Sequence, residues 1–393
     1  MKIISVVGAR PNFMKIAPFV RAVEKHHAEA ASNQKPRIEH VLVHTGQHYD
    51  ERMSRAFFDA LDIPRPDMDL GIGSGSHAEQ VGQTMIAFEK VIRRQQPDWV
   101  VVVGDVNATC ACSITAKKEG VRLAHIEAGL RSRDMTMPEE INRLVTDRLA
   151  DLLFTPDELS SANLRAEGVP EERIRFVGNI MIDTLETHRR QAAALSVASI
   201  LADNRLETGE DRRPPVRLDP SQPFALLTLH RPSNVDRRET LEPLVRLFME
   251  EIASRTPVVW PIHPRARKQL EEFGLWTGLL SQPGIILLHP LGYPETLKLN
   301  MEAAVVLTDS GGLQEECCVL GTPCLTLRWN TERPVTLREN GGTGVLVGND
   351  PARIRAAYDE ALQRTWHSVR PPLWDGHAAE RVLQGMIERG NNA

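Results

Sequence analysis

The chain has 393 residues, of which 41% are hydrophobic and 25% charged, the composition of a globular protein long enough for two domains. Its formal net charge of −5 provides no overall attraction to nucleic acid or to an anionic membrane, so neither is expected as a partner. No apolar run reaches the roughly 20 residues needed to cross a bilayer, and the first residues lack the apolar core of a signal peptide, so we expect a cytoplasmic protein.

Short apolar runs alternate with amphipathic stretches through the first half of the chain. The runs are KIISVVG, HVLVHTG, DWVVVVGD, VRLAHIEAG, DLLFT and IRFVGN. This alternation is typical of a parallel sheet covered by helices on both faces. We therefore predict an N-terminal Rossmann-like domain over residues 1–185.

A polar, proline-rich segment, TGEDRRPPVRLDPSQP, interrupts the alternation at residues 208–223. We place a connecting helix and linker at 186–222. The alternation restarts after it with FALLTLH, TPVVWPIH, IILLH, AAVVLTDSGG, TPCLTLR and TGVLVG. A second Rossmann-like domain is predicted at 223–365, and in such α/β sheets ligands bind beyond the carboxyl ends of the strands. We expect two doubly wound domains that face each other across a cleft.

Two loops near the N-terminus carry polar residues directly after predicted strands. In GARPNFMK, Arg10 and Lys15 flank a helix start whose free N–H groups would suit a phosphate; the alternative is a plain turn with solvated cations. In HTGQHYD, polar side chains that include Gln47 can bind a ligand or cap the next helix.

Two acids end neighbouring predicted strands. Four valines lead to Asp105, and Glu127 ends VRLAHIE, so both should emerge at the same edge of the sheet. Partial burial and nearby carboxylates raise the pKa of an acid, which suits such a group to proton transfer. Capping of the following helix by Asp105 is the alternative.

The stretch HIEAGLRSRDMTMPEEINR adds more opposed charge just beyond Glu127. Pro138 suits the first position of a helix, and acids in the first turn are favoured by the helix dipole. Arg143 lies four residues beyond Glu139, on the same helix face. One interpretation is a salt-bridged helix start; the other is a proton-transfer site, because these residues can converge with Asp105 on one cleft.

Polar residues also follow the strands of the second predicted domain. His230 comes directly after one strand, and a histidine there can change protonation near neutrality; the alternative is a structural histidine with satisfied hydrogen bonds. Another strand runs into Ser310, Gly311 and Gly312 at a helix start, where backbone N–H groups would hold a diphosphate. Glu315 and Glu316 lie one turn inside that helix, where a carboxylate can accept hydrogen bonds from the two hydroxyls of a ribose.

Two further strands of this domain also end in polar residues. One is followed by Arg328, Glu332 and Arg333, and the other is closed by His263.

The five cysteines form neither an even disulfide framework nor a paired CxxC zinc pattern. Most lie inside apolar segments, so we expect reduced core residues at Cys110, Cys112, Cys317, Cys318 and Cys324. No set of ligands stands at metal spacing, and no metal site or cofactor is predicted.

Eight motifs in order resemble the non-hydrolysing UDP-N-acetylglucosamine 2-epimerase family. They are GARPNFMK, HTGQHYD, GDVNAT, HIEAGLR, PEEINR, HRPSNVD, DSGGLQEE and NTERP, between residue 3 and about residue 348. The resemblance implies a fold like that of GT-B glycosyltransferases, a homodimer without metal or nicotinamide, and a role in cell-surface polysaccharide biosynthesis. It also implies that the terminal helix at 366–393 returns to the first domain.

The resemblance further implies interconversion of UDP-GlcNAc and UDP-ManNAc. The C2 proton is removed with anti elimination of UDP to give a 2-acetamidoglucal, and UDP then adds again. By motif matching, the acids and bases would be Asp105, Glu127 and Glu139, with Arg143 orienting them and His230 near the diphosphate. The UDP-binding residues would be Arg10, Lys15, His230, Ser310, Gly311, Gly312, Glu316 and Arg333.

One motif departs from the family pattern. Members often read HRxEN, whereas this chain reads HRPSN, with Ser233 in place of a glutamate. The resemblance assigns that loop, together with Gln47 and His263, to a second UDP-GlcNAc that activates bacterial members, so the contact set is incomplete here. Two other enzymes fit the same motifs in part: a hydrolysing epimerase that releases ManNAc and UDP, and a GT-B glycosyltransferase. A related substrate, such as a UDP-2,3-diacetamido uronate, is a further alternative.

Overall fold

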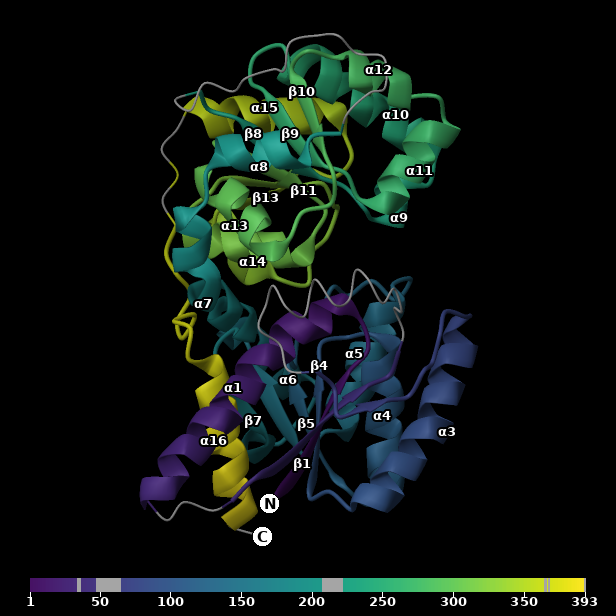
Figure 1. Ribbon diagram of the computed structural model, residues 1–393, viewed down its shortest axis with the longest axis vertical. Helices are drawn as coiled ribbons and strands as arrows, with labels where there is room; N and C mark the ends of the chain where they lie inside the picture. Colours follow the sequence, from purple (N-terminus) through teal and green to yellow (C-terminus); the bar gives the residue numbers. More distant parts are fainter. Residues whose placement is uncertain (34–36, 47–64, 207–221, 364–365, 367, 392–393) are drawn as a thin grey trace. The chain divides into compact units, whose positions relative to one another are not determined.

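We describe a computed structural model in residues 1–33, 37–46, 65–206, 222–363, 366 and 368–391. The chain divides into two compact units, shown in Figure 1. The first unit contains Met1–Thr187 and Pro372–Ala393, and the second contains His188–Pro371. Residues 208–221 of the predicted linker lie outside the described residues.

The described part of the first unit contains a parallel sheet of seven strands in the order β3-β2-β1-β4-β5-β6-β7. The strands are β1 Lys2–Val7, β2 Glu39–His44, β3 Met68–Asp69, β4 Trp99–Val103, β5 Arg122–Ile126, β6 Leu152–Thr155 and β7 Ile174–Phe176. The central strand β4 is buried along its whole length, as expected for a parallel strand covered on both faces.

Helices follow most strands of the first unit and cover its sheet (Figure 1). They are α1 Arg10–Asn33, α3 His77–Gln95, α4 Asn107–Lys118, α5 Pro138–Leu149, α6 Glu158–Ala166, the 3-10 turn Glu171–Arg173 and α7 Ile180–Ala194, which runs past Thr187. The last helix, α16 Ala378–Asn391, packs beside α1. Asp183 fixes its start, because the carboxylate accepts hydrogen bonds from the N–H groups of Ala378 and Ala379 at 3.0 and 2.8 Å.

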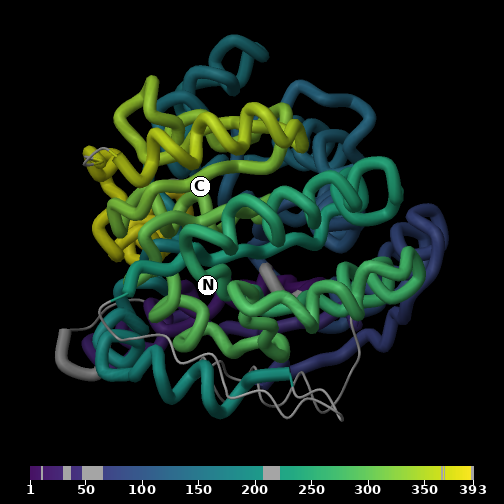
Figure 2. The backbone as a smooth tube through the Cα atoms, turned by 90° about the horizontal axis from the view of Figure 1, so that it is seen from above, coloured from purple at the N-terminus to yellow at the C-terminus, as the bar shows by residue number. Residues whose placement is uncertain are grey.

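The second unit repeats the arrangement, and its described residues form a six-stranded parallel sheet in the order β10-β9-β8-β11-β12-β13. The strands are β8 Ala225–Thr228, β9 Val258–Pro261, β10 Ile285–Leu288, β11 Val305–Thr308, β12 Cys324–Thr326 and β13 Gly344–Leu346. In the trace of Figure 2 this unit can be followed by colour from teal to yellow-green. The prediction of two doubly wound α/β sheets is confirmed.

Helices also separate the strands of the second unit. They are α8 Val197–Asn204, α9 Pro232–Val235, α10 Arg238–Arg246 with the π-helical turn Leu247–Ile252, α11 Pro264–Glu272, α12 Trp276–Ser281, α13 Tyr293–Glu302, α14 Gly311–Leu320, the 3-10 turns Pro334–Thr336 and Arg338–Asn340, and α15 Pro351–Gln363. Leu227, Trp260 and Leu307, from three adjacent strands, belong to one buried apolar cluster with the helices on that face.

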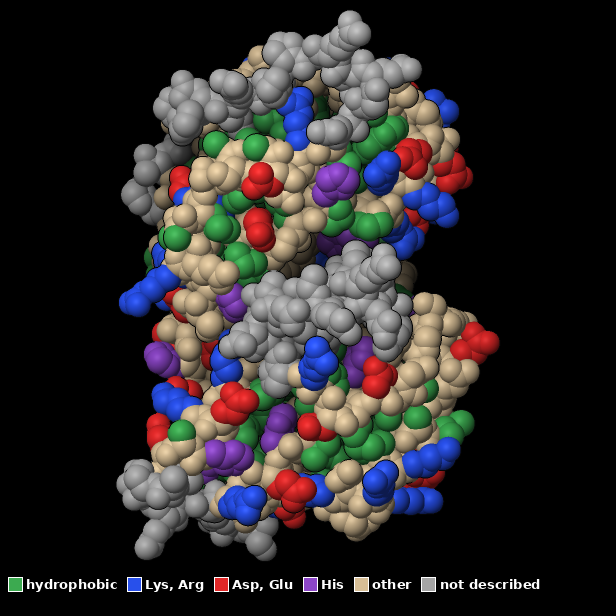
Figure 3. Space-filling view, viewed as in Figure 1, with side chains coloured by type: hydrophobic (Ala, Val, Ile, Leu, Met, Phe, Trp, Pro, Cys, Tyr) green, Lys and Arg blue, Asp and Glu red, His purple; other side chains and the backbone are tan. Residues whose placement is uncertain are grey.

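The cysteines lie within these cores. All five are buried and none forms a disulfide. Over the face in Figure 3, acidic and basic side chains are mixed among the residues that are coloured. No helix among the described residues is long and apolar enough to cross a membrane.

Candidate active site

Two predicted acids meet at the carboxyl edge of the first sheet because their strands are in register. Val103 of β4 pairs with Ile126 of β5, so Asp105 and Glu127 each stand just beyond a paired strand end. The amide of Gly104 donates to the carbonyl of Ile126 at 3.1 Å and continues the pairing into the loops. The common edge inferred from the strand pattern is therefore present.

Glu127 forms a buried ion pair with Lys15. Its Oε2 lies 2.5 Å from Lys15 Nζ, and the exposed fractions of the two side chains are 2% and 9%. Lys15 reaches this point from the first turns of α1, and Glu127 Oε1 is buried with no hydrogen-bond partner among the described residues. One oxygen of this carboxylate is thus held by a cation, and the other is buried and unpaired among the described residues.

The backbone at this edge adopts the left-handed region at two positions. Glu127 has φ of +70°, a conformation that costs a non-glycine residue roughly 1–2 kcal/mol. Gly104 has φ of +68°, and a Cβ there would lie 3.2 Å from Lys15 Nζ and 3.4 Å from Glu127 Oε2. Only glycine satisfies both the dihedral angle and the space at position 104.

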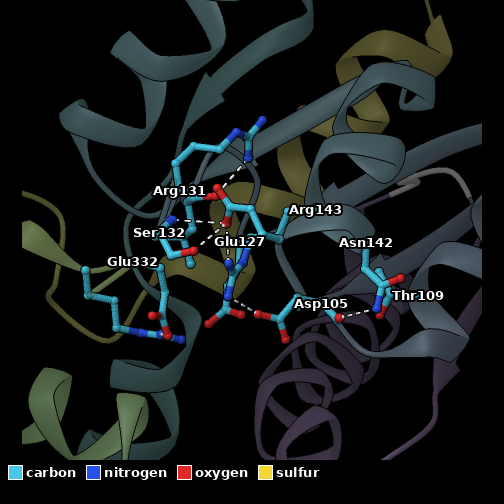
Figure 4. A network of polar contacts seen from close by, with 12 residues as sticks. Asp105, Thr109, Glu127, Arg131, Ser132, Asn142, Arg143 and Glu332 are labelled. Atoms are coloured by element: carbon cyan, nitrogen blue, oxygen red, sulfur yellow. Dashed lines mark hydrogen bonds and ion pairs between the residues drawn. The ribbon is translucent and has the colours of Figure 1, made fainter. Parts of the chain in front are cut away.

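Asp105 is bound by Arg143, as Figure 4 shows. Arg143 Nη2 lies 2.5 Å from Asp105 Oδ2, and the neighbouring Asn142 donates to the Asp105 carbonyl at 2.9 Å. Both partners come from α5, so the helix holds the side chain and the backbone of Asp105 together. The Asp105 side chain is 24% exposed, which leaves it accessible.

The second partner of Arg143 is Glu140. The helical spacing predicts Glu139 on the face of Arg143, but Nη1 of Arg143 lies 2.6 Å from Glu140 Oε2. Glu140 also accepts hydrogen bonds from the amides of Ser132 and Arg133, at 3.0 and 2.9 Å. Burial opposes ionisation of Glu140, but these donors and Arg143 outweigh it and lower its pKa. Glu139 is half-buried in the same helical turn.

In the second unit, the residue after β11 organises the loop after β8. Asp309 is fully buried, and its Oδ1 lies 2.8 Å from His230 Nδ1. It also accepts from the amides of His230 and Arg231, at 3.0 and 2.9 Å for Oδ2. Burial opposes its ionisation, but His230 and these amides lower the pKa of Asp309. His230, with a side chain 39% exposed, is therefore held by a buried anion.

His263 lies near His230, with ring centroids 5.5 Å apart. Its Nδ1 accepts a hydrogen bond from the amide of Arg265 at 3.2 Å and caps α11. Gln47 lies outside the described residues, as does the side chain of Arg10. The predicted second-nucleotide set is therefore only partly visible.

The predicted diphosphate loop begins α14. Ser310 precedes the helix, Gly311 and Gly312 form its first turn, and no side chain caps its N–H groups among the described residues. A Cβ at Gly311 would lie 2.7 Å from Arg333 Nη1, so the arginine crosses directly over this turn. Arg333 Nε donates to Glu315 Oε1 at 2.6 Å, and its guanidinium also pairs with Glu332. A helix N-terminus beside a guanidinium is suited to an anion.

Glu316 lies one turn further along α14 and is buried. Asn300 donates to its Oε2 at 3.4 Å. Burial raises the pKa of Glu316 to about 7, and the side chains of Tyr293 and Asn300 only partly offset the effect. Glu316 therefore differs from Glu140, which has ionic and backbone partners.

Four residues with buried polar contacts were not among the predicted site residues: Glu140 and Asp309, described above, and His125 and Asp147, which pair at 2.6 Å between β5 and α5. Asp309 carried the signal used for Asp105, an acid directly after a buried strand. Glu140 is adjacent to a selected acid, and only the fold of residues 131–137 distinguishes the two. His125 and Asp147 stand within regular elements, where a polar side chain has no separate signal. Among the described residues, no three His, Cys, Asp or Glu are arranged to hold a metal ion.

The chain matches a family described as UDP-N-acetylglucosamine 2-epimerase over residues 30–387. The UDP-N-acetylglucosamine 2-epimerase of Methanocaldococcus jannaschii is 39% identical over 389 residues, 98% of each chain. The UDP-2,3-diacetamido-2,3-dideoxy-D-glucuronate 2-epimerase of Pseudomonas aeruginosa is 35% identical over 390 residues, 99% of this chain and 100% of that protein.

Solved structures resemble the chain over the same length. The M. jannaschii UDP-GlcNAc 2-epimerase in complex with UDP-GlcNAc and UDP has a TM-score of 0.85 at 38% identity, covering 99% of this chain and 100% of that one. The Neisseria meningitidis enzyme bound to UDP-GlcNAc has a TM-score of 0.83 at 27% identity, with the same coverage. The resemblance seen in the motifs is confirmed: the protein is an isomerase that belongs to the UDP-N-acetylglucosamine 2-epimerase family.

Proposed function

We propose that this protein epimerises C2 of UDP-GlcNAc and UDP-ManNAc by the non-hydrolysing route. A base removes the C2 proton, the C1–O bond breaks with its electron pair leaving on UDP, and a 2-acetamidoglucal remains. A proton then returns to the other face of C2 as a UDP oxygen forms the C1–O bond again. The observation that carries this proposal is the pair of acids, Asp105 and Glu127, at one sheet edge with their cationic partners.

The acid and base roles fall to Asp105, Glu127 and Glu139. Epimerisation requires proton transfer on two faces of one carbon, so a single carboxylate is not enough. Lys15 balances the charge of Glu127, and Arg143 does the same for Asp105. The free oxygen of Glu127 and the partial exposure of Asp105 support direct roles for both.

The UDP-binding role falls to the second unit. The N–H groups of Ser310, Gly311 and Gly312 supply donors for the negative charge that develops as the diphosphate departs, Arg333 adds a cation, and His230 adds a polar side chain held by Asp309. The buried Glu316 would accept the ribose hydroxyls. Arg10 and Lys15, in the first unit, would complete the set of UDP-binding residues.

Three further assignments complete the proposal and rest on the family resemblance. We infer a first domain formed by residues 1–185 and 366–393 and a second domain formed by residues 223–365. Residues 186–222 connect them. We infer a homodimer, which light scattering of the purified protein would test. We also infer a cytoplasmic enzyme that supplies an activated sugar for cell-surface polysaccharide.

A second substrate has specific support. The Pseudomonas aeruginosa relative named for UDP-2,3-diacetamido-2,3-dideoxy-D-glucuronate is only slightly less similar, at 35% identity, than the M. jannaschii enzyme at 39%. A substrate panel should therefore contain both the 2-acetamido sugar and its 2,3-diacetamido uronate counterpart. The enzyme should convert one of them much faster.

NMR of the anomeric protons tests the proposal with purified protein in D2O. UDP-GlcNAc should give UDP-ManNAc with deuterium at C2 and little free UDP. Free UDP in proportion to ManNAc would instead identify a hydrolysing enzyme. Absence of deuterium from C2 during turnover would exclude elimination and favour a GT-B glycosyltransferase.

A further inference from the structure

His125 connects the two catalytic loops of the first unit. It lies in β5, two residues before Glu127, and is fully buried. Its Nδ1 lies 2.6 Å from Asp147 Oδ1, and its Nε2 lies 2.9 Å from the carbonyl oxygen of Gly104, the residue before Asp105. The His125 ring thus contacts the backbone next to Asp105, while His125 itself lies in β5, the strand that leads to Glu127.

Both ring nitrogens of His125 face acceptors. One is the Asp147 carboxylate and the other is the carbonyl oxygen of Gly104. The ring is thus held at both nitrogens, and because it is fully buried it has no surface at which to contact a substrate directly.

Asp147 holds the other side of Glu127. Its Oδ2 accepts from the amide of Gly129 at 3.0 Å and lies 2.7 Å from Arg131 Nη1. Residues 125 and 129 flank Glu127 symmetrically, and one carboxylate binds both. Burial opposes ionisation of Asp147, but His125 and Arg131 outweigh it and lower its pKa.

The Glu127 backbone needs such support because its φ of +70° is unfavourable for glutamate. Unfavourable dihedral angles persist where surrounding contacts over-determine them, and such sites often serve function. Apolar packing would stabilise the fold as well as a buried ion cluster does, so stability does not explain these charged residues. Their contacts instead fix the backbone geometry around Glu127.

We propose that Asp147 and His125 are positioning residues that set the placement of Glu127 relative to Asp105. Asp147 fixes the turn on both sides of Glu127, and His125 extends the same restraint to the Gly104 carbonyl. The inference rests on the proposed function, because it assumes that these two acids act on one carbon. Displacement of a reacting group by about 1 Å can cost about 100-fold in rate.

The test is Asp147→Asn, assayed by C2 deuterium incorporation and by net epimerisation. Asparagine lacks the negative charge that pairs with Arg131, and it presents an NH2 group in place of one of the two oxygens that contact His125 and the Gly129 amide. We expect kcat to fall between about 10-fold and 100-fold, while KM and the Kd for UDP stay within twofold, because the proposed UDP loop lies in the other unit.

Asp151→Asn is the matched control. Asp151 also binds β5, but at its opposite end, where Oδ2 accepts from the Leu123 amide at 2.7 Å and pairs with Lys117. It should retain kcat within twofold. An equal loss of kcat in both variants, or a kcat within twofold of wild type for Asp147→Asn, would overturn the inference.

His125→Gln and His125→Asn keep the inference testable if Asp147→Asn does not fold. The longer amide can still donate to the Gly104 carbonyl, whereas the shorter one reaches only toward Asp147. Higher kcat in His125→Gln than in His125→Asn is expected; the reverse order, or equal values, counts against the inference. A wild-type protein without activity would refute the proposed function, whereas active wild type with unaffected variants would refute only the positioning role.

Discussion

The carboxyl edges of the two sheets place glutamates in opposite electrostatic environments. In the first unit, Glu140 receives two backbone N–H groups and Arg143, and its pKa falls. In the second unit, Glu316 is buried with Asn300 as a weak donor, and burial raises its pKa to about 7. The first edge keeps Glu140 charged, so that it holds Arg143 beside Asp105. The second edge holds a carboxyl group whose proton is lost only near neutral pH.

The largest expected effect is on catalysis by the first edge. Glu127→Gln removes a proton acceptor, so kcat should fall by about 10²–10⁴-fold. The Kd for UDP, measured by calorimetry, should change by less than a few-fold, because the start of α14, Arg333 and Lys15 are all retained. Activity within tenfold of wild type would remove Glu127 from the proposed mechanism.

A control is needed because the Glu127→Gln substitution would leave Lys15 as a buried cation without a charged partner. Asp105→Asn provides it, since that side chain is 24% exposed and its loss disturbs the fold less. Both variants should lose activity, and only Glu127→Gln should also melt at a clearly lower temperature.

Glu316→Gln tests the electrostatic contrast through stability. A carboxyl group with a raised folded pKa binds more protons in the folded state between about pH 4.5 and 7, so its contribution to the free energy of unfolding falls as pH rises through that window. The loss is at most about 3 kcal/mol. The variant without ligand should therefore melt higher than wild type at pH 8 and similarly at pH 4.5.

Glu140→Gln should show the opposite sign. Its lowered folded pKa stabilises the protein above the ordinary glutamate pKa, and this contribution is lost as pH falls. The variant should melt lower than wild type at pH 8, with a smaller difference in acid. Glu302→Gln, at an exposed ion pair on α13, serves as the neutral control. Shifts of the same sign in Glu316→Gln and Glu140→Gln would contradict the contrast.

The sequence predicted what depends on strand periodicity. Alternating apolar runs predict both sheets, and the rule that parallel strands share a carboxyl edge predicts that Asp105 and Glu127 lie at the same edge, as the register of β4 and β5 shows. The sequence pattern does not distinguish Glu139 from Glu140 as the ion-pair partner of Arg143, because Arg143 lies within reach of both along a helix. The amides of residues 132 and 133 decide that choice, and their positions depend on loop geometry that no local pattern specifies.

Tertiary pairs inside regular elements were missed for a related reason. His125 and Asp147 are 22 residues apart, and their contact requires α5 to pack on β5 in one particular rotation. Periodicity predicts that a helix has a buried face, but it does not predict which polar group on that face meets a partner. Asp309 is different, because it followed a buried strand and the same rule that selected Asp105 would have found it.

Two glycine substitutions test whether the close packing around residue 104 at the first edge is needed for catalysis. Gly104→Ala forces a Cβ within 3.4 Å of Lys15 and Glu127 at φ of +68°, whereas Gly120→Ala meets nothing within 4 Å at φ of +74°. Both should lose roughly 1–2 kcal/mol from the dihedral angle alone. Only Gly104→Ala should also lose kcat, as measured by the NMR assay. Equal kcat in the two variants would show that the contact with Lys15 and Glu127 has no part in catalysis.

Gly311→Ala addresses the second edge, where the expected effect is smallest. A Cβ there would lie 2.7 Å from Arg333 Nη1, so the guanidinium must move away from the start of α14. We expect the Kd for UDP to rise about tenfold, equivalent to about 1.4 kcal/mol, with kcat at saturation near wild type. Gly82→Ala within α3 is the control, since its Cβ meets nothing within 4 Å and alanine favours a helix. It should raise the melting temperature and leave the Kd unchanged. A Kd for Gly311→Ala equal to that of Gly82→Ala would mean that Arg333 and this helix turn do not hold the diphosphate, and the division of roles between the two edges would then fail.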